Sequence, residues 1–300
     1  TKYGSTKSLD SWYVGKTYGE IWGYTVDRLY QKDDFVYGSD GKMVQVTLPT
    51  GVKINQLADA SAPTQGYLQG GNFYFGPGDV KFKDMNGDGK IDDGSRTTDD
   101  HGDLKVIGNS TPRYEYSLRL GADWKGVDVS VFMQGVGKRT VVGDGSLAIA
   151  GYNSGDGAMP EAIAGNFWRE DRTNAFYPRP FNLSCVAGDD ATRYNTVESD
   201  RYLLNMAYMR IKNITVGYAF PANLLKRFYI TKLRVYASLE NFFTFDHLGS
   251  LPIDPEDTNG LSTVWTSSVT ATSNTNYNSG RIGTGVPAFK TFSIGLQVNF

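Results

Sequence analysis

The sequence predicts an all-β fold on the basis of three observations. Apolar and polar residues alternate with a period of two in five separate stretches, as they do along half-exposed strands. Glycine fills 35 positions and aromatic residues make up 13% of the chain, a composition that suits strands joined by long turns. No stretch approaches about 18 consecutive apolar residues, which excludes a membrane-spanning helix. The net charge of −2 gives no electrostatic reason to expect a nucleic-acid partner.

Each alternating stretch is a predicted strand. In the first, Tyr114 and Leu118 share one face of the strand, while Glu115 and Arg119 share the other. Near Lys212–Asn213 the alternation slips by one residue, which predicts a β-bulge at that point. The five predicted strands are 114–124, 127–134, 209–220, 232–240 and 291–300.

The connections between these strands alternate between short and long. Lys125-Gly126 and 221–229 are short, whereas 143–201 and 243–288 are long and rich in Gly, Asn, Asp and Ser. An antiparallel arrangement places all the short turns at one end and all the long loops at the other. Outer-membrane barrels have this layout, with short periplasmic turns and long outer loops. Soluble sandwiches rarely carry loops of this length, so the asymmetry predicts strands of a transmembrane β-barrel.

Charged residues favour the membrane interpretation because they keep to one face of a strand. Glu115, Arg119 and Asp123 all alternate with the apolar residues of their stretch. A charge that faces lipid at mid-depth costs about 2–4 kcal/mol, so this face is expected to line a wet lumen. A soluble β-protein with its apolar face turned inward has the same alternation, and only the loop asymmetry separates the two interpretations. Aromatic residues near strand ends are expected at the membrane interfaces: Tyr114, Trp124, Tyr218, Phe220, Phe242, Phe243 and Phe300.

Five strands cannot close a wide barrel, since even small barrels contain about 8 strands. We therefore expect the C-terminal strands of a large antiparallel transmembrane β-barrel with long extracellular loops. The predicted order is an extracellular loop region 1–112, a barrel hairpin 113–142, an extracellular loop 143–201, a second barrel hairpin 202–242, an extracellular loop 243–288 and a closing strand 289–300.

Several segments resemble the SusC/RagA-type TonB-linked outer-membrane transporters, and they occur in the order that this family has. The segments are VGKTYGEIWGY (14–24), DRLYQ (27–31), GDVKFKDMNGDGKID (78–92), the run 106–139 that contains GVDVSVFMQG, YLLNMAYMRIKNITVGYAFP (202–221) and LRVYASLENFFTF (233–245). A final alternating strand that ends in Phe completes the set. The segment 93–104 departs from the family pattern as an insertion.

The resemblance implies that the chain is roughly the C-terminal third of a plugged barrel in the outer membrane, and that it is a transporter rather than an enzyme. It implies uptake of oligosaccharides or peptides, energised by the TonB complex through a part of the protein upstream of Thr1. It also implies a SusD-like surface lipoprotein that covers the barrel as a lid. No pattern in the long loops identifies the residues that contact the substrate.

The sharpest local motif is the Asp-rich loop 84–95, which has the ligand spacing of a calcium-binding loop. Side-chain oxygens at loop positions 1, 3, 5 and 9 and the carbonyl at position 7 would converge on one ion, while Gly89 allows the sharp turn. Position 12 is Ser95 instead of a bidentate Glu, so a further carboxylate is needed, from Asp93, Asp99 or Asp100. A polar turn stabilised for backbone reasons alone is the alternative. The predicted ligands of a structural Ca²⁺ are Asp84, Asn86, Asp88, Lys90 and Asp92.

Other candidate functional residues are few. Phe300 closes the last alternating strand, and the resemblance implies that it is an assembly signal for the barrel-assembly machinery. Three aromatic residues of the long loop could stack on sugars or simply pack the loop: Tyr152, Trp168 and Tyr177. No motif indicates a catalytic nucleophile. Besides the importer, the sequence leaves open a calcium-binding cell-surface β-protein that binds glycans without transport, and a secreted hydrolase.

Overall fold

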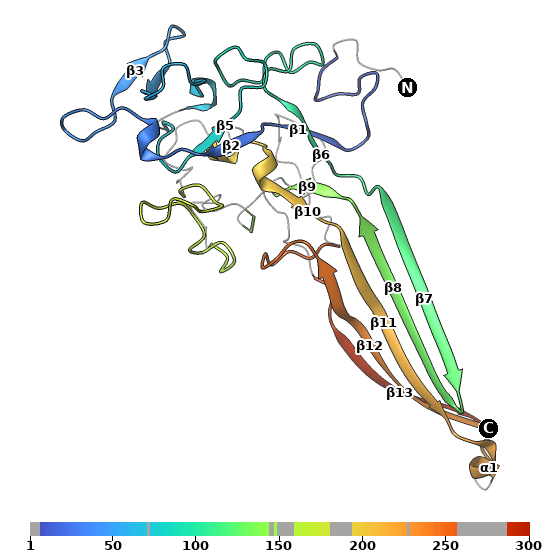
Figure 1. The fold of residues 1–300 in the computed structure, drawn as a ribbon. Coiled ribbons are helices and arrows are strands. Elements are labelled where there is room, and N and C mark those ends of the chain that lie inside the picture. Colours follow the sequence, from blue (N-terminus) through green and yellow to red (C-terminus); the bar gives the residue numbers. More distant parts are fainter. Residues whose placement is uncertain are drawn as a thin grey trace, which may run out of the picture.

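The computed structural model describes residues 7–70, 73–143, 147–148, 159–180, 194–226, 229–256 and 287–300. Within these ranges the chain is built from strands, with one short α-helix, α1 (Ala222–Leu225), so the all-β prediction is confirmed. Figure 1 shows two parts, a long narrow sheet and a broader head at one end of it. The head comprises the described residues of 7–113, 138–207 and 247–256.

The narrow sheet has five antiparallel strands in the order β13-β12-β11-β8-β7. All five predicted strands are present, as β7 (Tyr114–Trp124), β8 (Val127–Gly137), β11 (Tyr208–Ala219), β12 (Lys232–Asp246) and β13 (Thr291–Asn299). The turn between β7 and β8 and the connection that contains α1 lie together at the end far from the head (Figure 1). The head lies at the opposite end, where the long connections leave the sheet, as the alternation of loop lengths predicted.

Two strands are longer than the alternation predicted. β8 continues through two glycines because tyrosine side chains of β7 cover them: Tyr116 lies over Gly135, and Tyr114 over Gly137. β12 continues after Asn241, whose φ of 56° interrupts the pattern before Phe243 resumes it. Loop 243–288 therefore begins later than expected. The predicted bulge is confirmed, since the register of β11 shifts between Ile211 and Asn213 against both of its neighbours.

The head contains four small two-stranded antiparallel sheets. The pairs are β1 (Glu20–Gly23) with β6 (Lys105–Asn109), β2 (Val26–Leu29) with β5 (Val80–Phe82), β3 (Gln45–Thr47) with β4 (Lys53–Asn55), and β9 (Thr140–Val142) with β10 (Leu203–Asn205). Four 3-10 turns accompany them at Lys32–Asp34, Gly66–Leu68, Tyr194–Thr196 and Asp200–Tyr202. The described part of region 1–112 therefore contains strands and turns of its own, which period-2 alternation could not reveal because these strands are only three to five residues long.

Two apolar cores hold the head together. The larger core is formed mainly by residues of the first hundred positions, many of them aromatic, such as Tyr30, Phe73 and Phe82, and it also includes Trp168 and Tyr194. The smaller core joins residues of the two long connections: Val141, Ala148, Ile163, Tyr177, Tyr202, Met206, Leu248 and Ile253. Segments far apart in the sequence thus depend on each other for burial.

A buried ion pair joins the same segments at the larger core. The carboxylate of Asp79 is fully buried, and the guanidinium of Arg179 donates to both of its oxygens at 2.8 and 2.7 Å. Asn195 donates to Asp79 at 2.7 Å and accepts from the backbone N–H of Val80. Because a buried carboxylate is stable only when its oxygens are paired, these contacts tie Asp79 to two segments a hundred or more residues away.

Candidate functional site

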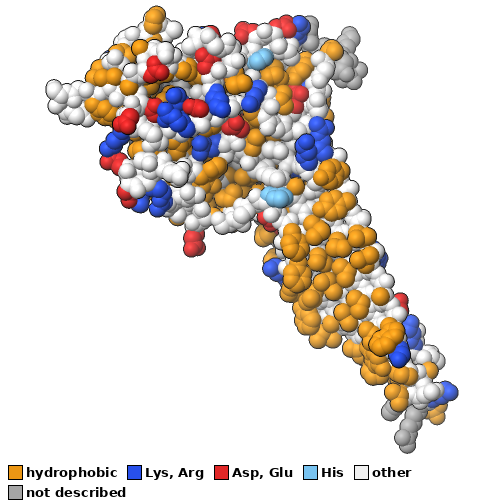
Figure 2. Space-filling model, in the orientation of Figure 1, with side chains coloured by type: hydrophobic (Ala, Val, Ile, Leu, Met, Phe, Trp, Pro, Cys, Tyr) orange, Lys and Arg blue, Asp and Glu red, His pale blue; other side chains and the backbone are white. Residues whose placement is uncertain are grey.

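One face of the five-stranded sheet is apolar across its width. The strand registers join apolar residues into continuous rows. Leu120 is 53% exposed and Ile294 is 72% exposed, and Figure 2 shows this surface as a broad apolar band along the sheet. One row consists of Leu120, Val131, Ile214, Leu239 and Phe292. The next rows toward the short turns consist of Ala122, Val129, Val216, Ala237 and Ile294, and of Trp124, Val127, Tyr218, Val235 and Leu296.

The opposite face of the same sheet is polar. One of its rows consists of Gly121, Ser130, Thr215, Ser238 and Ser293, and the neighbouring row consists of Asp123, Asp128, Gly217, Tyr236 and Gly295. The separation of apolar and charged faces expected from the alternation is therefore confirmed for the assembled sheet. A soluble protein would bury the apolar face, whereas here it is the exposed surface.

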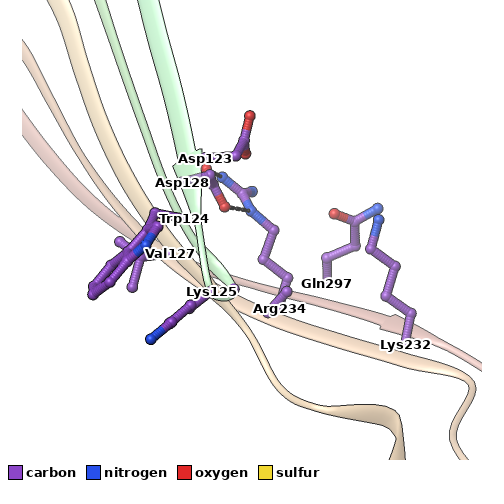
Figure 3. A pocket seen from close by; sticks show the side chains of 10 residues that line it. Asp123, Trp124, Lys125, Val127, Asp128, Lys232, Arg234 and Gln297 are labelled. Atoms are coloured by element: carbon purple, nitrogen blue, oxygen red, sulfur yellow. Dashed lines mark hydrogen bonds and ion pairs between the residues drawn. The ribbon is translucent and has the colours of Figure 1, made fainter.

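A paired charge crosses the polar face near the short turns (Figure 3). The Nε of Arg234 in β12 donates to the Oδ1 of Asp128 in β8 at 2.7 Å, and Nη2 donates to Oδ2. β11 runs between these two strands, and Gly217 lies beneath the pair. A Cβ atom at Gly217 would come within 2.5 Å of both Asp128 and Arg234, so a larger residue there would force the ends of both side chains to shift. The guanidinium also lies 5.0 Å from the ring centroid of Tyr236.

At the other end of the sheet, residues 247–256 form a strap that joins the head to the polar face. Arg210 of β11, which is buried, donates to Asp254 and to Glu256 at 2.7 Å each. Lys212 donates to Glu256 at 2.7 Å as well. Asp254 further accepts from the backbone N–H of Ala288 at 3.1 Å. The strap is thus held by a network in which two cations face two carboxylates.

The Asp-rich loop forms a compact series of turns in which side-chain oxygens accept backbone N–H groups. Asp84 accepts from Gly87 and from Gly89, at 2.5 and 2.8 Å. Asn86 accepts from the N–H of Asp88 at 3.0 Å. Gly89 has a φ of 80°, in agreement with the sharp turn expected there. All five predicted ligand residues therefore lie in one loop.

The loop oxygens are already engaged by groups of the protein. The ammonium of Lys90 lies 3.5 Å from Asp88 and also donates to Asp92. The three residues considered for the missing carboxylate have other contacts: Asp93 pairs with Arg96, Asp99 with Lys7, and Asp100 with Ser95. Among the described residues, no group of three or more Asp, Glu, His or Cys side chains is placed to hold a metal ion. As the side chains lie, the donor set fits a polar turn, and Ca²⁺ would have to displace Lys90.

Asp103 is a carboxylate of this region that the sequence analysis left without a role. It is fully buried and accepts from the backbone N–H groups of Met85 and Asp92, at 2.6 and 2.9 Å. Burial, together with the nearby charge of Asp84, raises its pKa. The residue lies near the end of the insertion 93–104. The insertion therefore supplies the acceptor for two backbone N–H groups of the Asp-rich loop. No local pattern could identify it, because its partners are backbone groups distant in sequence.

The aromatic residues considered for sugar stacking are placed differently from that hypothesis. Trp168 and Tyr177 are buried, at 7% and 6% exposure, and pack in the two cores of the head. The indole of Trp168 covers Gly78, which has no side chain to obstruct it. These two residues therefore pack the loop, which was the alternative to sugar stacking. Tyr152 lies outside the described residues.

Comparison with known proteins gives two informative relatives in Formosa agariphila. TonB-dependent receptor P3 is 30% identical over 252 residues, which cover 79% of this chain and 21% of the receptor. TonB-dependent receptor P39 is 24% identical over 258 residues, covering 77% of this chain and 21% of the receptor. The chain is homologous to TonB-dependent receptors. It spans about a fifth of the length of these relatives, whose names denote receptors and not enzymes.

No family model matches this chain. Its backbone is similar to the RagAB peptide importer in the open-open state, with a TM-score of 0.49 and 14% identity, covering 100% of this chain and 24% of that one. The closed-closed state of the same importer gives a TM-score of 0.44 at 17% identity, covering 85% of this chain and 25% of that one. None of the helices in the described residues has the length and apolar character needed to cross a membrane.

Proposed function

We propose that this chain forms the last strands and outer loops of a SusC/RagA-type TonB-dependent importer in the outer membrane. The observation that carries the proposal is the exposed apolar face of the five-stranded sheet, which lies back to back with a charged face. In water such a face would be a strong aggregation site. Against lipid it is stable, while the polar face lines an aqueous interior.

The strand edges favour the same proposal. β7 and β13 each have a neighbour on one side only among the described strands, so each leaves a row of backbone N–H and C=O groups without ladder partners. Open edges do not occur in the hydrocarbon of a bilayer, because each unsatisfied group costs several kcal/mol there. In the proposal, further strands of the same protein pair with β7 and β13 and close the barrel.

For the cargo we propose oligosaccharides or peptides, taken up together with a SusD-like surface lipoprotein. The RagAB structures are described as those of a peptide importer, which supports keeping peptides beside glycans. The TonB complex would act through parts of the protein outside this chain. The head lies at the end of the sheet opposite the short turns, so in the proposal it surrounds the outer mouth and faces the lipoprotein.

The direct test is migration of the detergent-extracted full-length protein in SDS gels before and after boiling. A closed membrane barrel resists SDS until it is heated, so the unheated sample is expected to run as a separate, faster band. Protein that dissolves as a monomer without detergent and migrates identically in both samples would contradict the proposal. It would favour the alternative, a calcium-binding cell-surface β-protein that binds glycans without transport.

A structural Ca²⁺ in the Asp-rich loop is a separate proposal. Its support is the spacing of Asp84, Asn86, Asp88, the Lys90 carbonyl and Asp92. Mass spectrometry of the protein purified in millimolar calcium is expected to find one ion, which Asp84→Asn together with Asp88→Asn removes. An equal calcium content in the double variant and the parent protein would rule this site out. Lys90→Gln is the informative companion, because removing the competing ammonium is expected to tighten binding.

The role of Phe300 as an assembly signal is likewise a proposal. The residue follows β13 directly and is 89% exposed, so it is accessible to an assembly factor. Deleting Phe300 is expected to lower the yield of the full-length protein in the outer membrane several-fold, whereas Phe300→Tyr retains an aromatic terminus and most of the yield. Unchanged yield after the deletion would mean that Phe300 is only the last interfacial aromatic residue.

A further inference from the structure

The apolar face ends at the short turns in a rim that combines aromatic rings with a cation. Trp124, 71% exposed, ends the last complete apolar row. Lys125 follows it, and its ammonium lies 4.8 Å from the centroid of the indole ring. Tyr218 in the same row packs against Phe220 with ring centroids 5.1 Å apart. We define the turn-end rim as Trp124, Lys125, Tyr218 and Phe220.

The turn itself fixes the position of the rim lysine. Lys125 and Gly126 form a two-residue connection with φ values of 47° and 86°, the pattern of a type I′ hairpin turn. The carbonyl of Gly126 accepts the backbone N–H of Ala219 at 2.7 Å, which ties the turn to β11. Figure 3 shows Trp124 and Lys125 on one side of the sheet, while Asp123, Asp128 and Arg234 project on the other. Lys125 is therefore held on the apolar side of the sheet.

No carboxylate neutralises the rim lysine, Lys125, within the described part of the chain. The nearest acidic residues in sequence, Asp123 and Asp128, belong to the polar face, and Asp128 is paired with Arg234. Lys125 forms no ion pair with any described residue. The indole occupies one side of the Lys125 ammonium, but an ammonium has three N–H donors, and those pointing away from the ring remain available for an oxygen anion.

We propose that the turn-end rim binds the headgroups of anionic phospholipids. The inference rests on the proposed membrane location of the sheet. In that setting Trp124 and Tyr218 lie at the level where aromatic rings prefer the lipid–water boundary. The adjacent ammonium of Lys125 then lies at the depth of the lipid phosphates, with a positive charge that no described carboxylate balances. A zwitterionic headgroup offers the same phosphate but adds its own cation, so a lipid with net negative charge is the complementary partner.

The size of the preference follows from the charge. One lysine near an anionic surface favours association by a factor of about 5 at low ionic strength. The effect is expected to weaken as salt increases, because the rim is exposed and the screening length falls below about 10 Å above 0.1 M salt. These values make the preference measurable.

The test uses the full-length receptor in bilayers that contain a bromine-labelled lipid, which quenches tryptophan at short range. The signal of Trp124 is isolated as the difference between the receptor and its Trp124→Phe variant. Brominated phosphatidylglycerol is compared with brominated phosphatidylcholine, each diluted into unlabelled phosphatidylcholine. We expect phosphatidylglycerol to quench Trp124 with a relative association constant about 5 times that of phosphatidylcholine.

The variants separate charge from folding. Lys125→Asn converts the turn to Asn-Gly, the preferred type I′ sequence, so the hairpin is retained while the charge is lost. It is expected to lower the ratio of the two association constants to about 1, whereas Lys125→Arg is expected to keep the ratio at about 5. Lys53→Gln, on a short strand of the head, is the matched control and leaves the ratio unchanged.

Two results would overturn the inference, and they are distinguishable. Equal quenching by both brominated lipids, or a ratio that Lys125→Asn does not change, would refute the headgroup site while leaving the membrane proposal intact. Absence of quenching by either lipid would remove the membrane location itself and the inference with it.

Discussion

Gly217 illustrates how a single residue organises the polar face. Its missing side chain allows Arg234 to reach Asp128 across the strand that separates them. In each strand the alternation places the charged residue, Asp128 or Arg234, opposite the apolar face. It could not predict that they pair, because the pairing depends on the registers of β8 and β12 against β11. Parity is a local property, whereas register is a property of the assembled sheet.

Gly217→Ala is expected to destabilise the full-length protein by up to about 1 kcal/mol, because the new Cβ would push apart the ends of the Asp128 and Arg234 side chains. Gly121→Ala is the matched control, since it lies on the same face and a Cβ there would meet only the carbonyl oxygen of Val129, at 3.7 Å. Urea unfolding in detergent measures both. If the two variants have the same unfolding midpoint, the steric role assigned to Gly217 is wrong.

At the scale of the strand, the two faces of β11 differ in their surroundings although they belong to the same twelve residues. Alternation in the sequence predicted the strand and its two faces correctly, and it also located the bulge near Lys212. It underestimated the lengths of β8 and β12. Gly135 and Asn241 broke the apolar pattern there. Tyr116 of the neighbouring strand covers Gly135, and pairing with β11 resumes at Phe243 after Asn241.

A pair of substitutions in β11 tests the assignment of its faces. Val216→Arg places a charge on the apolar face and is expected to cost about 2–4 kcal/mol if that face meets lipid at mid-depth. Thr215→Arg, one residue away, faces the polar side and is expected to change stability by less than about 1 kcal/mol. Yield of heat-modifiable protein in the outer membrane is the measurement. If Thr215→Arg lowered this yield more than Val216→Arg did, the assignment of the lipid-facing and polar faces would be wrong.

At the scale of the whole molecule, the strap connects the head to the sheet through charges as well as through packing. Leu248 and Ile253 lie in the smaller core of the head, while Asp254 and Glu256 pair with Arg210 and Lys212 of β11. Burial disfavours the charged form of Asp254. Its hydrogen bonds from Arg210 and from backbone N–H groups outweigh this effect, so its pKa is lowered.

The lowered pKa of Asp254 predicts a pH dependence of stability. A carboxylate whose pKa is lower in the folded state stabilises the fold above its ordinary pKa of about 3.9, and the contribution is lost as the pH falls through the folded value. Asp254→Asn is therefore expected to lower the free energy of unfolding by about 1–3 kcal/mol at pH 7, with a smaller difference below pH about 4. Urea unfolding between pH 7 and 3 measures this. Asp27→Asn, an exposed substitution in β2, is the control, and a constant difference at all pH values would contradict the prediction.

The sequence by itself determined the all-β class, the five long strands, their two faces and the arrangement of short and long connections. These features follow from period-2 alternation and turn chemistry, which are local. Tertiary structure decided which charges pair, that Trp168 and Tyr177 are buried, and that region 1–112 folds around an aromatic core. Some partners in these contacts lie more than a hundred residues apart, as Asp79 and Asn195 do. No local pattern encodes such contacts, because burial and register arise only when distant segments pack together.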